Sequence, residues 1–316
     1  MRKDFRFVHQ KLLQWFESFG RHDLPWRDPK DVYHVYLSEV MLQQTQVHRV
    51  QEHYYPYFLE KYPTLKDLAQ SQIEDLLASW SGLGYYSRAR NMHKTANLCI
   101  DGVPDDMKML QKLPGIGKYT ASAICNFGFK QCVSVVDTNI SRVIRRYFTL
   151  VDVSDSTVWN YADTFLNKQD ATSHNLALMD LGAMVCTPLN PKCFLCPLVD
   201  SCDGKNDPTL YTIKKKTQYE SMELYFGVHI QNGTIAVEAS TQKLYNGLLT
   251  LPQIDPIDED FIATFKHSYT KYKIDVKLYK TTYVPDEVKW IDIQKLKHMN
   301  ISSLTKKALG LIGFHS

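Results

Sequence analysis

Residues 110–129, LQKLPGIGKYTASAICNFGF, hold two helical patterns that are separated by a tight turn. The turn, residues 113–117, carries Gly115 and Gly117, which let the backbone approach another surface closely. Amides at the start of the second helix then face outward, where the helix dipole favours an anion such as a DNA phosphate. An ordinary helical corner needs only one glycine. The second glycine and Lys118 therefore favour a phosphate-gripping hairpin, which positions a chain on DNA without reading bases.

The composition sets outer limits on the fold and on the location of the protein. A chain of 316 residues suggests two domains, and 44% hydrophobic with 22% charged residues excludes global disorder. A formal net charge of +3 permits nucleic acid as a partner without requiring it. No apolar run is long enough to span a bilayer, and MRKDFRFVHQ at the start lacks the apolar stretch of a secretory signal. We therefore expect a cytoplasmic, bacterial, nucleoid-associated protein that acts as a monomer.

The periodicity of the chain changes after the last cysteine, Cys202. Before it, apolar residues recur at helical spacing in 5–19, 32–60, 73–80, 88–100, 118–128, 139–148 and 158–166. Residues 203–221 are polar and predict a linker, whose lysines 214–216 are most simply a solvated surface. Beyond the linker, Asn232-Gly233 predicts a hairpin, with strands at 244–252 and 271–284 and helices near 258–265 and 301–312. The predicted domains are thus an all-α domain over 1–202 and a smaller α+β domain over 222–316.

Four of the seven cysteines lie in CTPLNPKCFLCPLVDSC, residues 186–202. They are Cys186, Cys193, Cys196 and Cys202. Four thiolates in so short a segment of an intracellular protein favour a metal centre over disulfides. Zinc and a [4Fe–4S] cluster are both satisfied by four sulfurs, so the residues alone leave the choice open.

Two acidic residues stand out from apolar surroundings. Asp137, in SVVDTNISRVIRRYF, follows a strand-like run at 133–136 and precedes a helix, which predicts an N-cap. A capping aspartate is held rigidly and is kept ionised by helix amides. Glu39, in SEVMLQQTQV, lies among Val40, Met41 and Leu42. Burial there predicts a pKa above the usual ~4.3 of glutamate. The simpler interpretation, a glutamate on a helix's polar stripe, competes with this one.

Several motifs in order support a family resemblance. They are DLPWR (23–27), SEVMLQQTQV (38–47), GLGYYSRARN (82–91), LPGIGKYTASAI (113–124), VVDTNISRV (135–143) and LMDLGAMVCTP (178–188). Together they resemble the MutY-type adenine DNA glycosylases, a helix-hairpin-helix branch of the endonuclease III superfamily. The resemblance spans about 5–205. It implies that the four cysteines bind a [4Fe–4S] cluster and not zinc. The cluster is expected to brace a loop against DNA.

The resemblance also assigns the chemistry. It implies that Asp137 stabilises the cationic sugar, as carboxylates do in glycoside hydrolysis. Adenine leaves poorly as an anion, so Glu39 would protonate its N7. Tyr119 occupies the position of the lysine that marks strand-cutting members, which implies a monofunctional glycosylase. A tyrosine there is expected to donate a hydrogen bond to Asp137. A thymine-removing relative lacks the acid at Glu39, which supports adenine as the base.

Further positions match residues that handle the DNA in this family. Gln44 resembles the residue pushed into the helix beside the mispair, and Tyr85 resembles the one that stacks on the damaged guanine. Such wedges help to flip the target base, which costs a few kcal/mol. The expected adenine pocket is lined by Leu24, Trp26, Arg27 and Leu42, although Trp26 is equally consistent with plain core.

Residues 222–316 resemble, more weakly, the MutT-like domain with which this family inspects 8-oxoguanine. No Nudix box of glutamates is visible, so nucleotide hydrolysis is not expected. The family's Phe-Ser-His tip corresponds here to Tyr269, Thr270 and Lys271, in which lysine replaces the imidazole. That departure puts the preference for 8-oxoguanine over guanine in doubt. A plain β-hairpin with a polar edge is the alternative.

The expected function is removal of adenine from double-stranded DNA in which it is mispaired with 8-oxoguanine or guanine. One competing hypothesis is an endonuclease III-like enzyme that removes oxidised pyrimidines and nicks the strand. The other is a lesion sensor without catalysis, which would have no need of Glu39 and Asp137. Release of adenine from the mispaired duplex distinguishes the three.

Overall fold

The computed structural model describes residues 4–211, 218–242, 244–256, 260–269, 271–281, 284–285 and 287–314. Contacts between Cα atoms divide the chain into two compact units. The first contains the described residues up to Ile73 and those from Tyr85 to Tyr211. The second contains Glu74–Gly84 together with the described residues from 218 onward.

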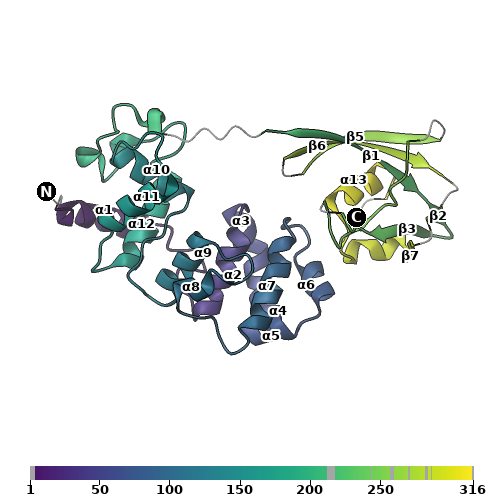
Figure 1. The fold of residues 1–316 in the computed structure, drawn as a ribbon, viewed down its shortest axis with the longest axis horizontal. Coiled ribbons are helices and arrows are strands. Elements are labelled where there is room, and N and C mark those ends of the chain that lie inside the picture. Colours follow the sequence, from purple (N-terminus) through teal and green to yellow (C-terminus); the bar gives the residue numbers. More distant parts are fainter. Residues whose placement is uncertain are drawn as a thin grey trace. The chain divides into compact units, whose positions relative to one another are not determined.

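The chain before the linker is helical throughout (Figure 1). Its α-helices are α1 Arg6–Phe19, α2 Val32–Leu42, α3 Val47–Arg49, α4 Tyr55–Lys61, α5 Leu65–Gln70, α6 Ile73–Ser79, α7 Ser87–Leu98, α8 Met107–Leu110, α9 Lys118–Ala123, α10 Thr138–Tyr147, α11 Asp155–Phe165 and α12 Ala171–Met184. Single turns of other helix types are η1 Val50–Tyr54, η2 Ile124–Gly128, η3 Cys193–Leu195, η4 Val199–Ser201 and η5 Pro208–Tyr211. The predicted all-α character of this part is confirmed.

Side-chain caps and one strained residue set where these helices begin and end. Asp31 caps α2 by accepting from the amide of His34, and Thr64 forms a reciprocal capping box with Asp67 at α5. The sequence predicted a continuous helical pattern over 32–60, but α2 ends at Leu42. The backbone then turns through Gln44, whose φ of 57° lies in the left-handed region. That turn interrupts the helix beside the candidate site.

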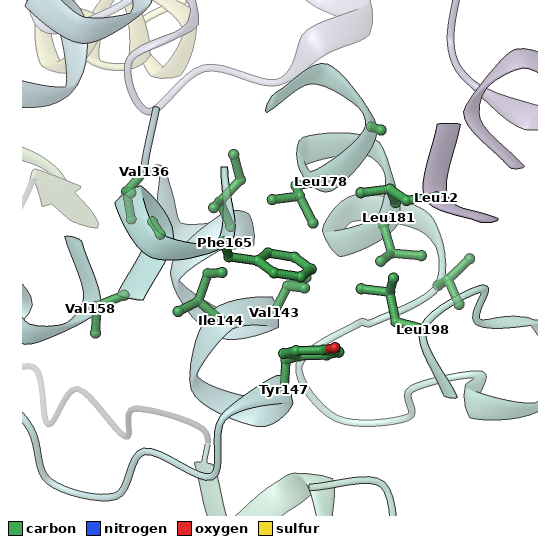
Figure 2. Packing of buried hydrophobic residues seen from close by; sticks show 14 of the residues in the cluster. Leu12, Val136, Val143, Ile144, Tyr147, Val158, Phe165, Leu178, Leu181 and Leu198 are labelled. Atoms are coloured by element: carbon green, nitrogen blue, oxygen red, sulfur yellow. The ribbon is translucent and has the colours of Figure 1, made fainter. Parts of the chain in front are cut away.

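The main core of the first unit joins segments from both of its ends. Leu12 of α1 packs with residues of α10, α11 and α12 around the fully buried ring of Phe165. Figure 2 shows this ring between Leu178 and Tyr147, and Leu198 of the cysteine segment lies in the same cluster. The core therefore holds α12 against both the first helix and the segment that carries the cysteines.

The chain after the linker is a mixed α+β region, as predicted. Its elements are β1 Glu220–Val228, β2 Ile230–Gln231, β3 Thr234–Ala239, β4 Leu249–Thr250, β5 Phe261–Tyr269, β6 Tyr272–Lys280, β7 Lys289–Asp292, η6 Ile293–His298 and α13 Ser303–Leu311. One sheet has the order β1-β6-β5, with β1 and β6 parallel and β5 antiparallel to β6. In the other, β3 pairs with β2, β4 and β7. The turn between β2 and β3 is the predicted hairpin at Asn232-Gly233, where both residues have positive φ.

Two local predictions were wrong. The expected helix near 258–265 is the strand β5 where the structure describes it, because its short apolar run fits either period. The expected strand at 244–252 is reduced to the two residues of β4.

The strand-like run at 133–136 belongs to no helix or strand of the described residues. Its backbone pairs instead with the side chain of Asn175, which accepts from Val135 N (3.2 Å) and donates to Val133 O (2.9 Å).

None of the helices in the described ranges is long and apolar enough to cross a membrane.

Replacing Phe165 by alanine should test the main core. The change removes a ring from a close-packed site and leaves a cavity, so we expect a loss of about 4 kcal/mol in the free energy of unfolding. Urea denaturation followed by circular dichroism measures it. The matched control is Phe194→Ala, because the Phe194 side chain is 83% exposed and its truncation should leave stability unchanged. Equal effects of the two changes would contradict the packing described.

Candidate active site

The two acidic residues singled out in the sequence line the same cavity. This cavity has a volume of about 330 Å³ and lies within the first unit. Glu39 reaches it from the last turns of α2, and Asp137 reaches it from the residue before α10. Five other residues expected at the site also line it, namely Leu24, Trp26, Arg27, Leu42 and Tyr119. A cavity of this size lies in the range of small-molecule sites.

Burial dominates the protonation of Glu39. Its side chain is buried, and loss of water around the carboxyl raises its pKa to about 7. A hydrogen bond from the Tyr119 hydroxyl and the charge of Arg27 oppose this shift, whereas the nearby Asp137 reinforces it. The direction agrees with the expectation from the apolar neighbours of Glu39. At neutral pH a substantial fraction of this carboxyl therefore carries a proton.

Asp137 caps α10, as expected. Its Oδ1 accepts from the amide of Ile140 (2.7 Å), and its Oδ2 accepts from Nδ2 of Asn139 (2.9 Å). These bonds favour the ionised form, but burial outweighs them and raises the pKa above its usual value. That Asp137 is kept ionised by helix amides therefore stays a prediction. More hydrogen bonds support a charge on Asp137 than on Glu39.

Tyr119 lies against Glu39. The sequence led us to expect a hydrogen bond from Tyr119 to Asp137, but the hydroxyl is bonded to the Glu39 carboxyl instead. The ring packs in a cluster with Val35, Phe127 and Val135, which fixes its direction. Burial raises the pKa of Tyr119 well above its usual range, so the hydroxyl remains a neutral donor.

The wall opposite α2 is formed by the loop before it. Leu24 is buried, and the Trp26 ring meets the ring of Tyr55 edge-on with centroids 5.5 Å apart. Trp26 thus lines the cavity and also packs against the buried ring of Tyr55. Arg27 donates to Asp180 Oδ1 (2.6 Å), and its side chain is only 9% exposed.

The two expected wedge residues lie outside the cavity lining. Gln44 is exposed and has a φ of 57°. Tyr85 is partly buried and has a φ of 49°. Arg88 connects the two turns. Its Nη1 donates to the carbonyls of Val40, Met41 and Gln43 (3.1, 2.7 and 2.7 Å), and its guanidinium lies 5.5 Å from the centroid of the Tyr85 ring. One buried cation therefore holds both strained turns.

The glycine-rich turn lies between α8 and α9. Gly115 has a φ of 77°, and a Cβ there would come within 2.9 Å of Asn91. At Gly117, which precedes α9, an added Cβ would meet open space. The ammonium of Lys118 lies 4.0 Å from the centroid of the Trp159 ring, so this side chain rests on α11. Gly115, Gly117 and Lys118 are exposed and are not part of the cavity lining.

The four clustered cysteines line one small pocket of their own. None forms a disulfide, and the Arg146 guanidinium donates to Cys186 Sγ (3.2 Å) and to three carbonyls of residues 186–188 (2.8 to 3.2 Å). Within the described ranges, no three acidic, histidine or cysteine side chains converge closely enough to bind an ion as they stand. Four free thiols around one pocket nevertheless suit a soft metal centre in number and chemistry.

The expected lesion-reading residues belong to the second unit. Tyr269 ends β5, and its ring lies 4.7 Å from that of Tyr245. Lys271 precedes β6 and forms an ion pair with Glu220. Thr270 lies outside the described residues.

Other residues at the cavity were not foreseen from the sequence. Arg21, Ser38, Lys130 and Asn139 contribute polar groups to its lining. Behind the wall, Asp180 is fully buried and accepts hydrogen bonds from both Arg21 and Arg27. In the sequence, the signal for this buried ion pair is the acid in the apolar stretch LMDLG, taken together with the two arginines of RHDLPWR.

Comparison with known proteins agrees with this geometry. Residues 37–177 match the model of the HhH-GPD superfamily of base excision DNA repair proteins. An adenine DNA glycosylase of Buchnera aphidicola subsp. Baizongia pistaciae is 39% identical over 66% of this chain and 61% of that protein. Another from Buchnera aphidicola subsp. Schizaphis graminum is 33% identical over 78% of this chain and 74% of that protein. The chain belongs to the adenine DNA glycosylase family.

The fold of this adenine DNA glycosylase family member is also found in a solved relative. A thermostable thymine-DNA glycosylase superposes with a TM-score of 0.58 at 28% identity, covering 63% of this chain and 94% of that one. The family match spans α2 to α12 and so includes Glu39, Tyr119 and Asp137.

Arg88→Met should loosen the turn after α2. Methionine keeps the apolar bulk but leaves three carbonyls without their donor, which should cost about 3 kcal/mol of stability. Faster hydrogen exchange at the amides around Gln44 should accompany the loss. Lys94→Met on the exposed face of the same helix, α7, is the control and should change neither. Unchanged exchange in Arg88→Met would show that the arginine does not hold the turn.

Proposed function

We propose that the protein hydrolyses the N-glycosidic bond of adenine in duplex DNA where adenine is mispaired with 8-oxoguanine or guanine. The observation that carries the proposal is the placement of Glu39 and Asp137 on one cavity in a member of the adenine DNA glycosylase family. Burial favours the protonated form of Glu39, and the Ile140 and Asn139 hydrogen bonds favour the ionised form of Asp137, which is the division of labour that this cleavage needs.

Glu39 donates its proton to N7 of the flipped adenine. Protonation lets the base leave as a neutral molecule when the C1′–N9 bond breaks. A pKa of about 7 suits this step, because the carboxyl is often protonated yet gives its proton up readily. The Tyr119 hydroxyl, bonded to Glu39, keeps the carboxyl pointed in one direction.

Asp137 stabilises the positive charge that develops on the sugar. Its two oxygens are held by the Ile140 amide and the Asn139 side chain, so the carboxylate need not reorganise as the charge appears. Water then bonds to C1′ and releases a proton, which leaves an abasic site and free adenine. With tyrosine at position 119 and no amine there, a Schiff base with the sugar is not formed at that position. This argues against the endonuclease III-like alternative, which cuts the strand.

DNA is bound through its backbone at the glycine-rich turn and through its bases at the wedges. Gly115, Gly117 and Lys118 contact phosphates, and the exposed position of the two glycines supports this role. Gln44 enters the helix beside the mispair and Tyr85 stacks on the opposite base, which offsets the cost of flipping adenine. Leu24, Trp26, Arg27 and Leu42 then surround the adenine. Such a substrate lies in the bacterial nucleoid.

A [4Fe–4S] cluster is held by Cys186, Cys193, Cys196 and Cys202. The shared pocket, the free thiols and the hydrogen bond from the Arg146 guanidinium to Cys186 Sγ support this assignment. The cluster would brace the segment 186–202 and supplies no proton or nucleophile for base removal. Arg146 ties the same segment to α10, the helix that Asp137 caps.

The chain after the linker is a MutT-like domain that reads the base opposite adenine. Tyr269, Thr270 and Lys271 are proposed to read this base; Tyr269 ends β5 and its ring packs against that of Tyr245, and Lys271 precedes β6. Glu220 pairs with Lys271, which reduces the positive charge that this lysine offers to DNA. The helical domain over 1–202 performs the chemistry, and the linker over 203–221 joins the two.

Glu39→Gln should abolish most adenine release from a duplex with adenine opposite 8-oxoguanine. Loss of the acid should slow single-turnover release about 10²- to 10³-fold. In the wild type, release should decline as the pH rises through about 7, because deprotonation of Glu39 removes the proton donor. Glu60→Gln, at an exposed site, should behave like the wild type.

Equal rates for Glu39→Gln and the wild type would remove this acid from the mechanism. Binding of the duplex without any release would indicate a lesion sensor instead. Nicking of a duplex with an oxidised thymine, without release of adenine, would favour the endonuclease III-like enzyme.

Cys196→Ser should cost the protein its metal centre. We expect the purified wild type to contain iron and sulfide and to absorb in the visible range, and the variant to lose most of both. Cys132→Ser changes an exposed cysteine outside the pocket and should retain them. Zinc in place of iron in the wild type would refute the cluster assignment and leave the proposed cleavage untouched.

A further inference from the structure

Asp180 is a fully buried carboxylate that no step of the proposed reaction uses. It lies on α12 and has no exposed surface. Its Oδ2 accepts from Arg21 N (2.8 Å), and its Oδ1 accepts from Arg21 Nε and Nη2 (2.8 and 2.6 Å) and from Arg27 Nη2 (2.6 Å). A buried charge is costly unless it is paired and hydrogen-bonded in this way. Every one of these donors comes from the single loop that precedes α2.

This arrangement fixes one wall of the cavity. Leu24 and Trp26, which line the cavity, lie between the two arginines that Asp180 holds. α12 itself contributes mainly apolar side chains to the lining, Leu176, Met179 and Ala183. The loop and α12 are therefore held together by the ion pairs of Asp180 with Arg21 and Arg27, here called the clamp. The clamp lies behind an otherwise apolar wall.

Arg27 is the member of the clamp that acts on Glu39. Its side chain is almost wholly buried, lines the same cavity and is close enough for its charge to favour the ionised form of Glu39. An acid that must deliver a proton is weakened by an unbalanced cation beside it. Asp180 is the anion at hydrogen-bonding distance from Arg27, and it shares its single charge between Arg27 and Arg21.

The other charged and titratable groups around Glu39 come from four places. Tyr119 on α9 donates to it, and Asp137 before α10 adds a negative charge. Arg21 in the loop and Lys130 after η2 also line the cavity. Arg21 is already engaged by Asp180 through three bonds, and the Lys130 side chain is exposed, where water screens its charge. Arg27 is thus the buried cation whose balance matters most for Glu39.

We propose that Asp180 is a positioning residue that draws Arg27 onto α12 and offsets part of its charge, so that Glu39 keeps the proton it delivers to adenine. The inference rests on the proposed function, because it concerns the proton of that reaction. Without the charge of Asp180, Arg27 either remains as an unbalanced cation or turns to pair with Glu39. Both outcomes favour an ionised Glu39 and so remove the acid at neutral pH.

The test is the titration of Glu39 in the full-length protein, followed by the carboxyl ¹³C resonance after labelling of glutamate. Glu39→Gln assigns the resonance. In Asp180→Asn we expect the titration midpoint of Glu39 to fall by about one pH unit, the low end of the effect of an adjacent charge. The decline of adenine release with rising pH should move to lower pH by the same amount. Asp101→Asn removes an exposed acid and should shift neither.

A second pair of variants covers a failure of Asp180→Asn to fold. Arg27→Gln and the double variant Arg27→Gln/Asp180→Asn leave no buried cation for Asp180 to balance. If Asp180 acts through Arg27, these two should share one Glu39 midpoint. Different midpoints in this pair would overturn the proposal.

The two levels of inference fail separately. A lower rate in Asp180→Asn with an unchanged midpoint and an unchanged pH profile would overturn the positioning role and leave the proposed function standing. A lowered midpoint in a protein that releases no adenine would support the balance of charge at Glu39 and overturn the adenine chemistry. The titration needs no DNA, so the two results are independent.

Discussion

The site depends on one constraint, the burial of the Glu39 carboxyl away from water. Glu39 can hold a proton near neutral pH only while α2, the loop before it and Tyr119 exclude solvent from its side chain. Each of these elements is fixed by contacts elsewhere, α2 by the Asp31 cap and the Arg88 bonds, and the loop by Asp180. The chemistry of one side chain is therefore a property of the packing of the whole unit.

α10 and α12 connect the cavity with the cysteine segment. Asp137 caps α10 and accepts from Asn139, whose Oδ1 accepts from Arg142 (3.0 Å). Arg142 donates in turn to Cys186 O (2.7 Å). Arg146 on the same helix binds the carbonyls of the cysteine segment and of Pro208. Arg142 and Arg146 are thus internal donors, and their hydrogen bonds hold the cysteine segment against α10.

Features that depend on local spacing were predicted from the sequence. α1, α10 and the hairpin at Asn232-Gly233 follow from periodicity, caps and a turn dipeptide, and the two acids in one cavity followed from the family motifs. Features that depend on distant partners were missed. In the sequence, Asp180 is one polar residue in an apolar helical stretch. Only the structure shows that Arg21 and Arg27 donate to it. The partner of Tyr119 was missed for the same reason, since both acids lie near its ring and only the fold distinguishes them.

The core around Phe165 contains Leu12 from the first helix and Leu198 from the cysteine segment. During synthesis this core is incomplete until Leu198 has left the ribosome, so α1 must wait for partners that are made much later. The cysteines at 186–202 emerge at that same moment. The core can therefore close only at the stage of synthesis at which the cysteine segment has also emerged.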